Sequence, residues 1–325
     1  MLVYVVLWEM HWRAQGYTPN IDNSKGLWSM QRTRLIEEGG DSTAFIGVSR
    51  TLFNIDLETW ASEMGTSVPI QLASMKSAPI IFLRDLAEDE DFSGFVVIGV
   101  TPAPFFNGTE DKAGLLEFYK KETPGQKWGQ RLSMILEDSF AFMEHEVGLF
   151  SLLNKVQLTD RPGTMSEPQE TPKISNMDKN RQAHMWWKLE QDPAYQRQIQ
   201  ALWGEALNPL PFKKSQAQID LKISEINQHV SAIRNRGGAV VFVRFPSSHA
   251  YLDWEQSEFP RDRYWDELIR QTNATGIHFE DYPALTGYDL PDWSHLSADD
   301  AARFTNDLVT FVKPVYLDWK NSKPR

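Results

Sequence analysis

The chain has 325 residues, of which 44 are acidic and 33 basic, so its formal net charge at pH 7 is −11. This balance argues against a general binder of nucleic acids or anionic membranes, because such proteins usually carry a basic surface. Hydrophobic residues make up 41% of the sequence, which indicates a folded globular protein. The absence of cysteine excludes disulfides, thiolate metal sites, Fe–S clusters and cysteine nucleophiles.

The N-terminus begins with a short apolar run, Leu2–Trp8, followed by the polar residues Glu9, His11 and Arg13. A membrane-spanning helix needs about 20 apolar residues, so this run is too short to cross a bilayer. It also lacks the basic start and the small-residue cleavage site of a signal peptide. Two interpretations of residues 1–40 stay open: the remnant of a longer membrane anchor whose beginning is missing, or a segment packed on the domain.

Five short apolar runs are typical of buried strands. They are Thr43–Val48, Val68–Leu72, Gly94–Val100, Ala239–Arg244 and Ile277–Glu280. Because the runs are continuous rather than alternating, they indicate a parallel sheet covered on both faces. Helical patterns accompany them at Leu52–Met64, Pro79–Glu88, Ser215–Arg236, Asp262–Thr272 and Ala298–Val312. The alternation predicts a doubly wound α/β domain.

The third and fourth predicted strands are too far apart for a simple crossover, so we expect a large helical insertion between them. Within it, Trp128–Leu153 and Asn180–Leu207 have helical patterns, the second interrupted near Pro193, and the proline-rich Asp160–Ser175 is typical of a loop. The insertion is a candidate lid, cap domain or partner-binding surface. The predicted organisation is an N-terminal segment (1–40), an α/β domain (41–106 and 237–325) and the insertion (107–236).

Ser49 follows the first predicted strand, in the run Gly47-Val48-Ser49-Arg50, at the start of a helix. Open α/β sheets bind ligands at the carboxyl ends of their strands. The free N–H groups at a helix N-terminus favour developing negative charge. Ser49 is therefore a candidate nucleophile. The alternative is a helix N-cap, a position that serine often occupies.

Asp292 and His295 lie three residues apart, just before the last predicted helix. An aspartate at this spacing can orient the imidazole of the histidine. The histidine can then take the proton of a serine that the fold brings near. The alternative is a surface turn that precedes the helix.

Ser49 after the first strand, with Asp292 and His295 before the last helix, makes the sequence resemble the SGNH (GDSL-like) hydrolase superfamily. It looks closest to the envelope branch, which includes polysaccharide O-acetyltransferases and esterases. The resemblance covers about residues 43–105 and 237–313. It implies a flavodoxin-like parallel sheet, with Ser49 as nucleophile, His295 as general base and Asp292 as its orienting partner.

The oxyanion hole of this superfamily uses the backbone N–H of the nucleophile, a glycine after the second strand and an asparagine after the third. This sequence has no glycine in Ala73–Ser77, and Thr101 stands where the asparagine would be. Loss of one oxyanion donor costs about 100- to 1,000-fold in rate. These departures keep a second interpretation open, a non-catalytic SGNH-fold envelope protein that binds a glycan or a partner protein.

Three further residues are candidates for oxyanion or substrate binding beside Thr101, namely Arg50, Arg244 and His249. Arg50 could hold a carboxylate or phosphate of the substrate, or form an ion pair with one of the many acids. Arg244 and His249 follow the fourth strand and so belong to the same sheet edge. A metal site built from His249 and the Asp292 motif lacks the usual ligand spacing, so no metal is expected.

The sequence as a whole predicts a serine esterase or O-acyltransferase that acts on an acetyl ester, with a cell-envelope carbohydrate as the expected substrate class. No cofactor is expected. The expected location is the cell envelope, with the cytoplasm as the alternative. Expected partners are the ester substrate, a membrane reached through an N-terminal anchor and a protein bound by the insertion, but no nucleic acid.

Overall fold

A computed structural model describes residues 2–39, 42–75, 77–108, 113–148, 151–152, 172–207 and 214–323. In chain order, its first half contains α1 (Leu2–Ala14), α2 (Lys25–Glu37), β1 (Thr43–Ile46), α3 (Ser49–Phe53), α4 (Leu57–Met64), β2 (Ile70–Gln71), α5 (Ile80–Glu88), β3 (Phe95–Gly99), α6 (Pro102–Asn107), α7 (Ala113–Lys121), α8 (Pro124–Glu137) and the 3₁₀ helices η1 (Ala141–Met143) and η2 (His145–Val147). Its second half contains β4 (Ser175–Met177), β5 (Ala183–Met185), α10 (Trp187–Gln191), α11 (Pro193–Leu207), α12 (Gln216–Asn235), β6 (Ala239–Arg244), α13 (His249–Glu258), α14 (Arg261–Thr272), β7 (Thr275–His278), η3 (Phe279–Asp281), η4 (Pro283–Leu285) and α15 (Ala298–Ser322).

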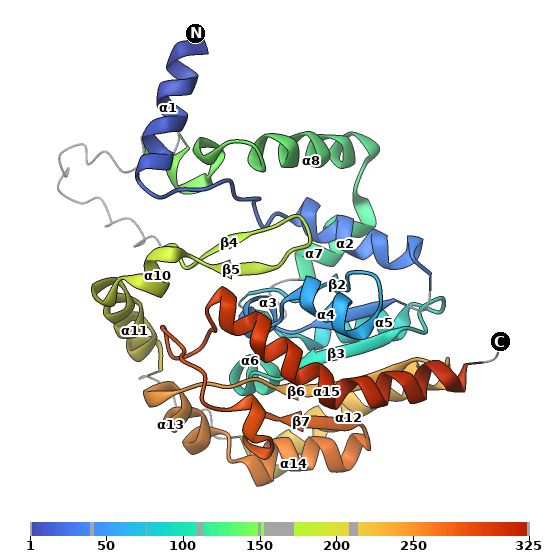
Figure 1. Ribbon diagram of the computed structural model, residues 1–325. Helices are drawn as coiled ribbons and strands as arrows, with labels where there is room; N and C mark the ends of the chain where they lie inside the picture. The colour runs from blue at the N-terminus through green and yellow to red at the C-terminus, as the bar shows by residue number, and fades with distance from the viewer. Residues whose placement is uncertain are drawn as a thin grey trace, which may run out of the picture.

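A five-stranded sheet in the order β2-β1-β3-β6-β7 forms the centre of the protein, and every neighbouring pair is parallel (Figure 1). Ala44, Val96 and Val240 lie side by side across the three middle strands. The expected α/β class with a parallel five-stranded sheet is confirmed, and the strand order is compatible with a flavodoxin-like fold. The order reverses between β1 and β3, which is the place where such sheets bind ligands.

The strands carry apolar side chains on both faces of the sheet, and helices pack on both faces and bury these side chains. On one face, Ile98 and Phe242 pack in a cluster with α2, α5, α12 and α14, and the whole predicted stripe of α12 is buried there. On the other face, Val97 packs with Trp60 of α4 and Phe304 of α15. This burial of large apolar side chains is the main stabilising contribution to the fold.

A third apolar cluster lies beside α3, at the carboxyl end of β1. It joins Leu27 of α2 and Phe53 of α3 to Met177 and Met185 of the β4–β5 hairpin and to Ile199 of α11. Segments far apart in the sequence therefore meet next to Ser49.

Several predicted elements differ from the observed ones. The single helix expected at 52–64 is wrong, because the side chain of Asp56 accepts a hydrogen bond from Thr59 N (2.7 Å) and starts α4 as a separate helix. The helix expected at 128–153 is also wrong in its second half, since α8 ends at Glu137 and η1 and η2 follow.

The helical prediction for residues 180–207 is wrong at its start, where β5 pairs with β4 in an antiparallel hairpin. Of the loop expected at Asp160–Ser175, residues 160–171 lie outside the described residues. The last helix continues beyond the predicted end at Val312 and passes through Pro314. Burial of Trp319, whose Nε1 donates to Gly237 O (2.7 Å), outweighs the missing backbone donor of the proline.

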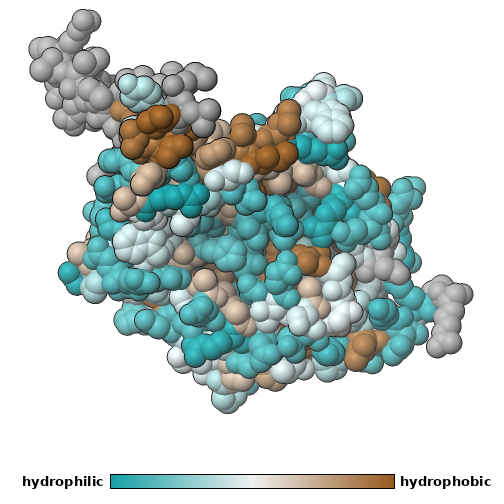
Figure 2. Space-filling view, turned by 45° about the horizontal axis from the view of Figure 1, so that its top comes forward, coloured by the Kyte–Doolittle hydropathy of each residue, from teal (hydrophilic) through white to brown (hydrophobic). Residues whose placement is uncertain are grey.

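Exposed apolar side chains gather on one outer surface, at the top of Figure 2, where α1 and α8 lie in Figure 1. The exposed residues of α1 include Val3, Tyr4, Leu7 and Met10, and those of α8 are Trp128, Leu132, Ile135 and Leu136. We call this set the α1–α8 apolar surface. None of the helices in the described ranges is both long and apolar enough to cross a membrane.

Candidate functional site

Ser49 is the first residue of α3, directly after the turn that ends β1. The N-cap of α3 is Val48, and no side-chain hydrogen bond caps this helix, so the interpretation of Ser49 as an N-cap is wrong. Its side chain is half-buried. Ser49 and Arg50 occupy the first two helical positions, whose backbone N–H groups have no carbonyl partner within the helix. These N–H groups are suited to hold an oxyanion.

Glycines at the ends of two neighbouring strands fix the position of α3. A Cβ on Gly47 would lie 1.9 Å from Thr51 Oγ1, and one on Gly99 would lie 2.0 Å from the same atom. The side chain of Thr51 therefore packs against both strand ends only because neither carries a side chain. Since Thr51 is two residues after Ser49, this contact sets the place of the serine at the sheet edge.

Asp292 and His295 are paired, as their spacing predicts. His295 Nδ1 lies 2.6 Å from Asp292 Oδ2, and Asp292 Oδ1 accepts from the backbone N–H groups of Ser294 (3.0 Å) and His295 (2.8 Å). Burial opposes ionisation of Asp292. Electrostatic attraction to the imidazole of His295 and these hydrogen bonds outweigh burial and lower the pKa of the carboxyl below its ordinary value. The pair is therefore buried with Asp292 as a carboxylate, and the surface-turn interpretation is wrong.

Trp203 contributes a further donor to this pair, which the sequence analysis did not predict. Its Nε1 donates to Asp292 Oδ2 at 3.2 Å, from α11. Gln200, one turn earlier, donates to Pro291 O (2.8 Å). Nothing in the sequence marks these contacts, because α11 lies about 90 residues from the Asp292 motif and the pairing depends on the fold.

The ring of His295 packs on α3. Its centroid lies 4.3 Å from that of Phe53, one turn after Ser49. His295 Nε2 is buried and has no hydrogen-bond partner in the described part of the chain. With Nδ1 directed at Asp292, Nε2 is the nitrogen left to accept a proton. Ser49 and Nε2 are not hydrogen-bonded here, and catalytic pairs often tighten only when substrate binds.

The residues on either side of His295 also contact α3. Ser294 Oγ accepts from Arg50 Nε (3.0 Å), and Leu296 N donates to Asn54 Oδ1 (3.0 Å). The Asp292 motif is thus fixed against the helix that begins with Ser49. These two segments, distant in sequence, meet at the carboxyl end of β1.

Thr101 follows β3, the neighbour of β1, and is the N-cap of α6. Its Oγ1 is buried and has no hydrogen-bond partner among the residues that the structure describes. The hydroxyl is therefore available as a donor at the sheet edge. In the loop after β2, by contrast, Ser74 N already donates to Gly47 O (3.1 Å).

Arg50 forms an ion pair, one of the two interpretations of this residue. Its buried guanidinium donates through Nη1 to both carboxylate oxygens of Glu255 (3.0 and 3.1 Å), and Arg244 Nη2 donates to the same carboxylate (2.7 Å). Burial opposes the charge of Glu255, but Arg244, Arg50 and a hydrogen bond from Ser247 lower its pKa. Arg50 and Arg244 thus link α3, β6 and α13, and Arg50 Nη2 is buried without a hydrogen-bond partner among the described residues. No contact described here tests whether either side chain also binds substrate, so both of these stay predictions.

His249 lies apart from the buried group. It is exposed at the start of α13, its Nδ1 lies 3.0 Å from Ser248 Oγ, and its ring stacks near Trp293 at a centroid distance of 6.3 Å. Trp293 itself has a left-handed backbone conformation (φ 68°), which is uncommon for a bulky residue. The structure therefore places His249 beside the turn of the Asp292 motif rather than against His295.

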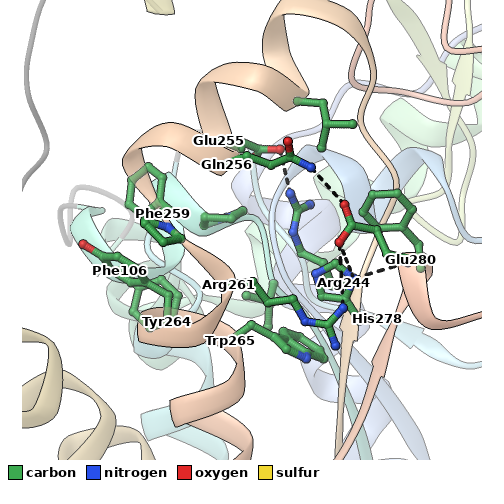
Figure 3. A pocket seen from close by; sticks show the side chains of 15 residues that line it. Phe106, Arg244, Glu255, Gln256, Phe259, Arg261, Tyr264, Trp265, His278 and Glu280 are labelled. Carbon is green, nitrogen blue, oxygen red and sulfur yellow. Dashed lines mark hydrogen bonds and ion pairs between the residues drawn. The ribbon is translucent and has the colours of Figure 1, made fainter.

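A cavity of about 310 Å³ opens at the carboxyl ends of β3, β6 and β7 (Figure 3). Its aromatic walls are formed by Phe106, Phe259, Tyr264 and Trp265, and its polar end contains Arg244, Glu255, His278 and Glu280. Burial, together with the charges of Arg244 and Arg261, lowers the pKa of His278 to about 3, so this histidine is neutral at physiological pH. Arg244 lines this cavity, whose lining does not include Ser49, Asp292 or His295.

No group of three or more His, Asp or Glu residues that could hold a metal ion occurs within the described ranges. No protein-family model matches the chain, and no curated protein shows significant similarity to it.

Proposed function

We propose that the protein is a serine esterase or O-acyltransferase of the SGNH type. Its substrate would be an acyl ester, with an acetylated cell-envelope carbohydrate as the substrate class. One observation carries the proposal: His295 is bound to the buried Asp292 through Nδ1, has an unpartnered Nε2, and packs on the helix that starts with Ser49.

In this mechanism, Ser49 Oγ attacks the acyl carbonyl carbon while His295 Nε2 takes the serine proton. The bond between the carbonyl carbon and the alcohol oxygen then breaks, and the alcohol leaves with the proton from His295. The backbone N–H groups of Ser49 and Arg50 and the hydroxyl of Thr101 would stabilise the oxyanion. Water as the second acceptor gives an esterase, and a sugar hydroxyl gives a transferase.

We further propose that the segment between β3 and α12 is an insertion in the sheet domain that helps to hold the catalytic group. Trp203 donates to Asp292, and Glu190 Oε1 accepts from Ala298 N (2.9 Å) at the start of α15. Both contacts join this segment to the residues that surround His295. Orientation of the imidazole then depends on the insertion as well as on the sheet.

A fluorophosphonate probe should form a covalent bond with Ser49, because the probe captures a serine that a neighbouring base deprotonates. Mass spectrometry of the digested protein would show the added mass on the peptide that contains Ser49. The Ser49→Ala variant is the control and should carry no label. Label on another serine, or no label under conditions that modify a known serine hydrolase, would contradict the proposal.

We also propose that the α1–α8 apolar surface contacts a lipid membrane, which fits an envelope location. Trp128, Leu132, Ile135 and Leu136 recur at helical spacing on α8, so they form one stripe. Arg131 lies over the Trp128 ring (5.2 Å), as is common for side chains at the boundary between lipid and water. α1 projects from the same side of the molecule (Figure 1).

The protein should therefore sediment with phosphatidylcholine vesicles, whose lipids carry no net charge, and replacing both Leu132 and Ile135 by glutamate should release most of it, because two charges would enter the lipid-facing stripe. Leu221→Glu is the matched control, since Leu221 is 73% exposed on α12, outside this surface. Equal sedimentation of the double variant and the wild type would exclude α8 as a lipid contact.

A further inference from the structure

Arg181 is a buried cation whose partners are all neutral. It lies in the turn between β4 and β5 and is 1% exposed. Its Nη1 donates to Gln71 O (2.8 Å), and its Nε and Nη2 donate to Asn23 Oδ1 (3.2 and 2.8 Å). No carboxylate forms an ion pair with it within the described ranges, in contrast to Arg50. Burial lowers the pKa of Arg181 to about 9, so the side chain still carries its charge at pH 7.

The backbone around Arg181 is held in place for this burial. Arg181 has a left-handed conformation (φ 62°), which costs free energy in a residue other than glycine. The carboxylate of Asp178 accepts from Asn180 N (2.8 Å) and Gln182 N (2.9 Å), which fixes the turn. A strained turn thus places a long charged side chain inside the protein, where an uncompensated charge is costly.

Arg181 lines a cavity of about 210 Å³ together with Lys25, Asn23 and Ser74. A guanidinium has five N–H donors, and three of those of Arg181 are used, so two stay available. Lys25 is exposed at the first position of α2 and forms no ion pair in the part of the chain that is described. Glu117 interacts electrostatically with Lys25, but its carboxylate forms an ion pair with Lys121 (2.7 Å).

This cavity is joined through the backbone to the segment that precedes the proposed nucleophile. Ser74, which lines it, donates its backbone N–H to Gly47 O (3.1 Å), and Gly47 is two residues before Ser49. Arg181 donates a hydrogen bond to the carbonyl of Gln71, the last residue of β2, and β2 pairs with β1. Two cationic side chains, a hydroxyl and an amide therefore converge on one cavity at the carboxyl edge of the sheet.

We propose that this cavity, which we call the Arg181 cavity, binds an oxyanion group: a carboxylate, phosphate or sulfate. The anion would neutralise the charge of Arg181. It would accept hydrogen bonds from the two remaining N–H donors of Arg181 and from Lys25 Nζ. It would be either a free ion or a group of the ester substrate. Only the second source rests on the proposed function.

Thermal unfolding in the presence of sodium phosphate, sulfate or glucuronate tests the site directly, with sodium chloride at equal ionic strength as the reference. At about 100 times the Kd, the best of these anions should raise the melting temperature by about 4 °C, because it binds only the folded chain. Lys25→Met should remove most of this rise. Lys120→Met, which changes an exposed lysine of α7 outside the cavity, should keep it.

Arg181→Met is a second variant, and it should lose the anion response completely. If Arg181→Met does not fold, Lys25→Met still tests the proposal, because substitution of the exposed Lys25 should leave the fold intact. Ser49→Ala should respond to anions as the wild type does, so failure of the proposed catalysis would leave this measurement intact. No rise for the wild type with any of the three anions, or an equal rise in Lys25→Met, would overturn the proposal.

Steady-state kinetics then identifies the source of the anion. If it belongs to the substrate, Lys25→Met should raise KM about tenfold for an O-acetylated glucuronate and leave KM for an O-acetylated glucose unchanged. If the ligand is a free ion, neither KM should change while phosphate still stabilises the wild type. Either KM result identifies the source of the anion only if anions stabilise the wild type and fail to stabilise Lys25→Met.

Discussion

The Ser49→Ala variant should have a kcat/KM for an acetyl ester at least about 1,000-fold below that of the wild type. The reason is that Ser49 is the proposed nucleophile, and removal of a serine nucleophile leaves only the weak effect of the oxyanion donors and binding. Initial rates with 4-nitrophenyl acetate and with an acetylated oligosaccharide would measure the loss. The melting temperature should stay close to that of the wild type, since one half-buried hydroxyl is lost.

Ser248→Ala provides the matched control. Ser248 is also half-buried and lies beside the Asp292 motif, where its backbone N–H donates to Trp293 O (3.0 Å). That bond survives the substitution, so activity should change little. If Ser49→Ala and Ser248→Ala retained equal activity, Ser49 would not be the nucleophile, and the binding-protein interpretation would take its place.

Asp292→Asn should lower kcat by about 10⁴-fold with little change in backbone structure. An amide in place of the carboxylate no longer holds the Nδ1–H tautomer of His295, so Nε2 loses its role as proton acceptor. The 2.6 Å contact between Nδ1 and Oδ2 is the interaction that is lost. Single-turnover kinetics with an activated ester would show the effect on acylation, and Asp289→Asn, which changes an exposed aspartate of the same loop, is the control.

The same variant should change how stability depends on pH. The folded-state pKa of Asp292 is lowered, so the carboxylate stabilises the protein above its unfolded-state pKa of about 3.9. This contribution decreases as the pH falls from there through the folded-state pKa. Between pH 5 and pH 2 the free energy of unfolding of the wild type should therefore decrease more steeply than that of Asp292→Asn. Parallel curves, or activity in Asp292→Asn within tenfold of the wild type, would contradict the assigned role.

The sequence alone predicted the features that depend on neighbouring residues. Continuous apolar runs located all five strands of the central sheet, and the stripe of α12 is buried as its spacing predicts. The contact between Asp292 and His295 was also predictable, because the two residues are three positions apart and can meet within one turn of the chain.

What sequence reasoning missed depends on contacts between distant segments. Glu255 meets Arg50 and Arg244 only after α13 has packed on the sheet, and a single glutamate in a helix gives no sign of such a role. Trp203 reaches Asp292 through the packing of α11. The strands of the β4–β5 hairpin have three residues each and no continuous apolar run that would indicate them, and the buried position of Arg181 follows from that hairpin.

The central sheet joins segments from the two ends of the chain, and this has a consequence for synthesis. β3 pairs with β6, although residues 100–238 lie between them. Parallel pairing of remote segments forms slowly, because a long loop must close before its contacts are made. While the ribosome makes residues 100–238, the edge of β3 has no partner strand and is open to aggregation. His295 is synthesised after β7, so a growing chain contains all five strands before it contains the proposed general base.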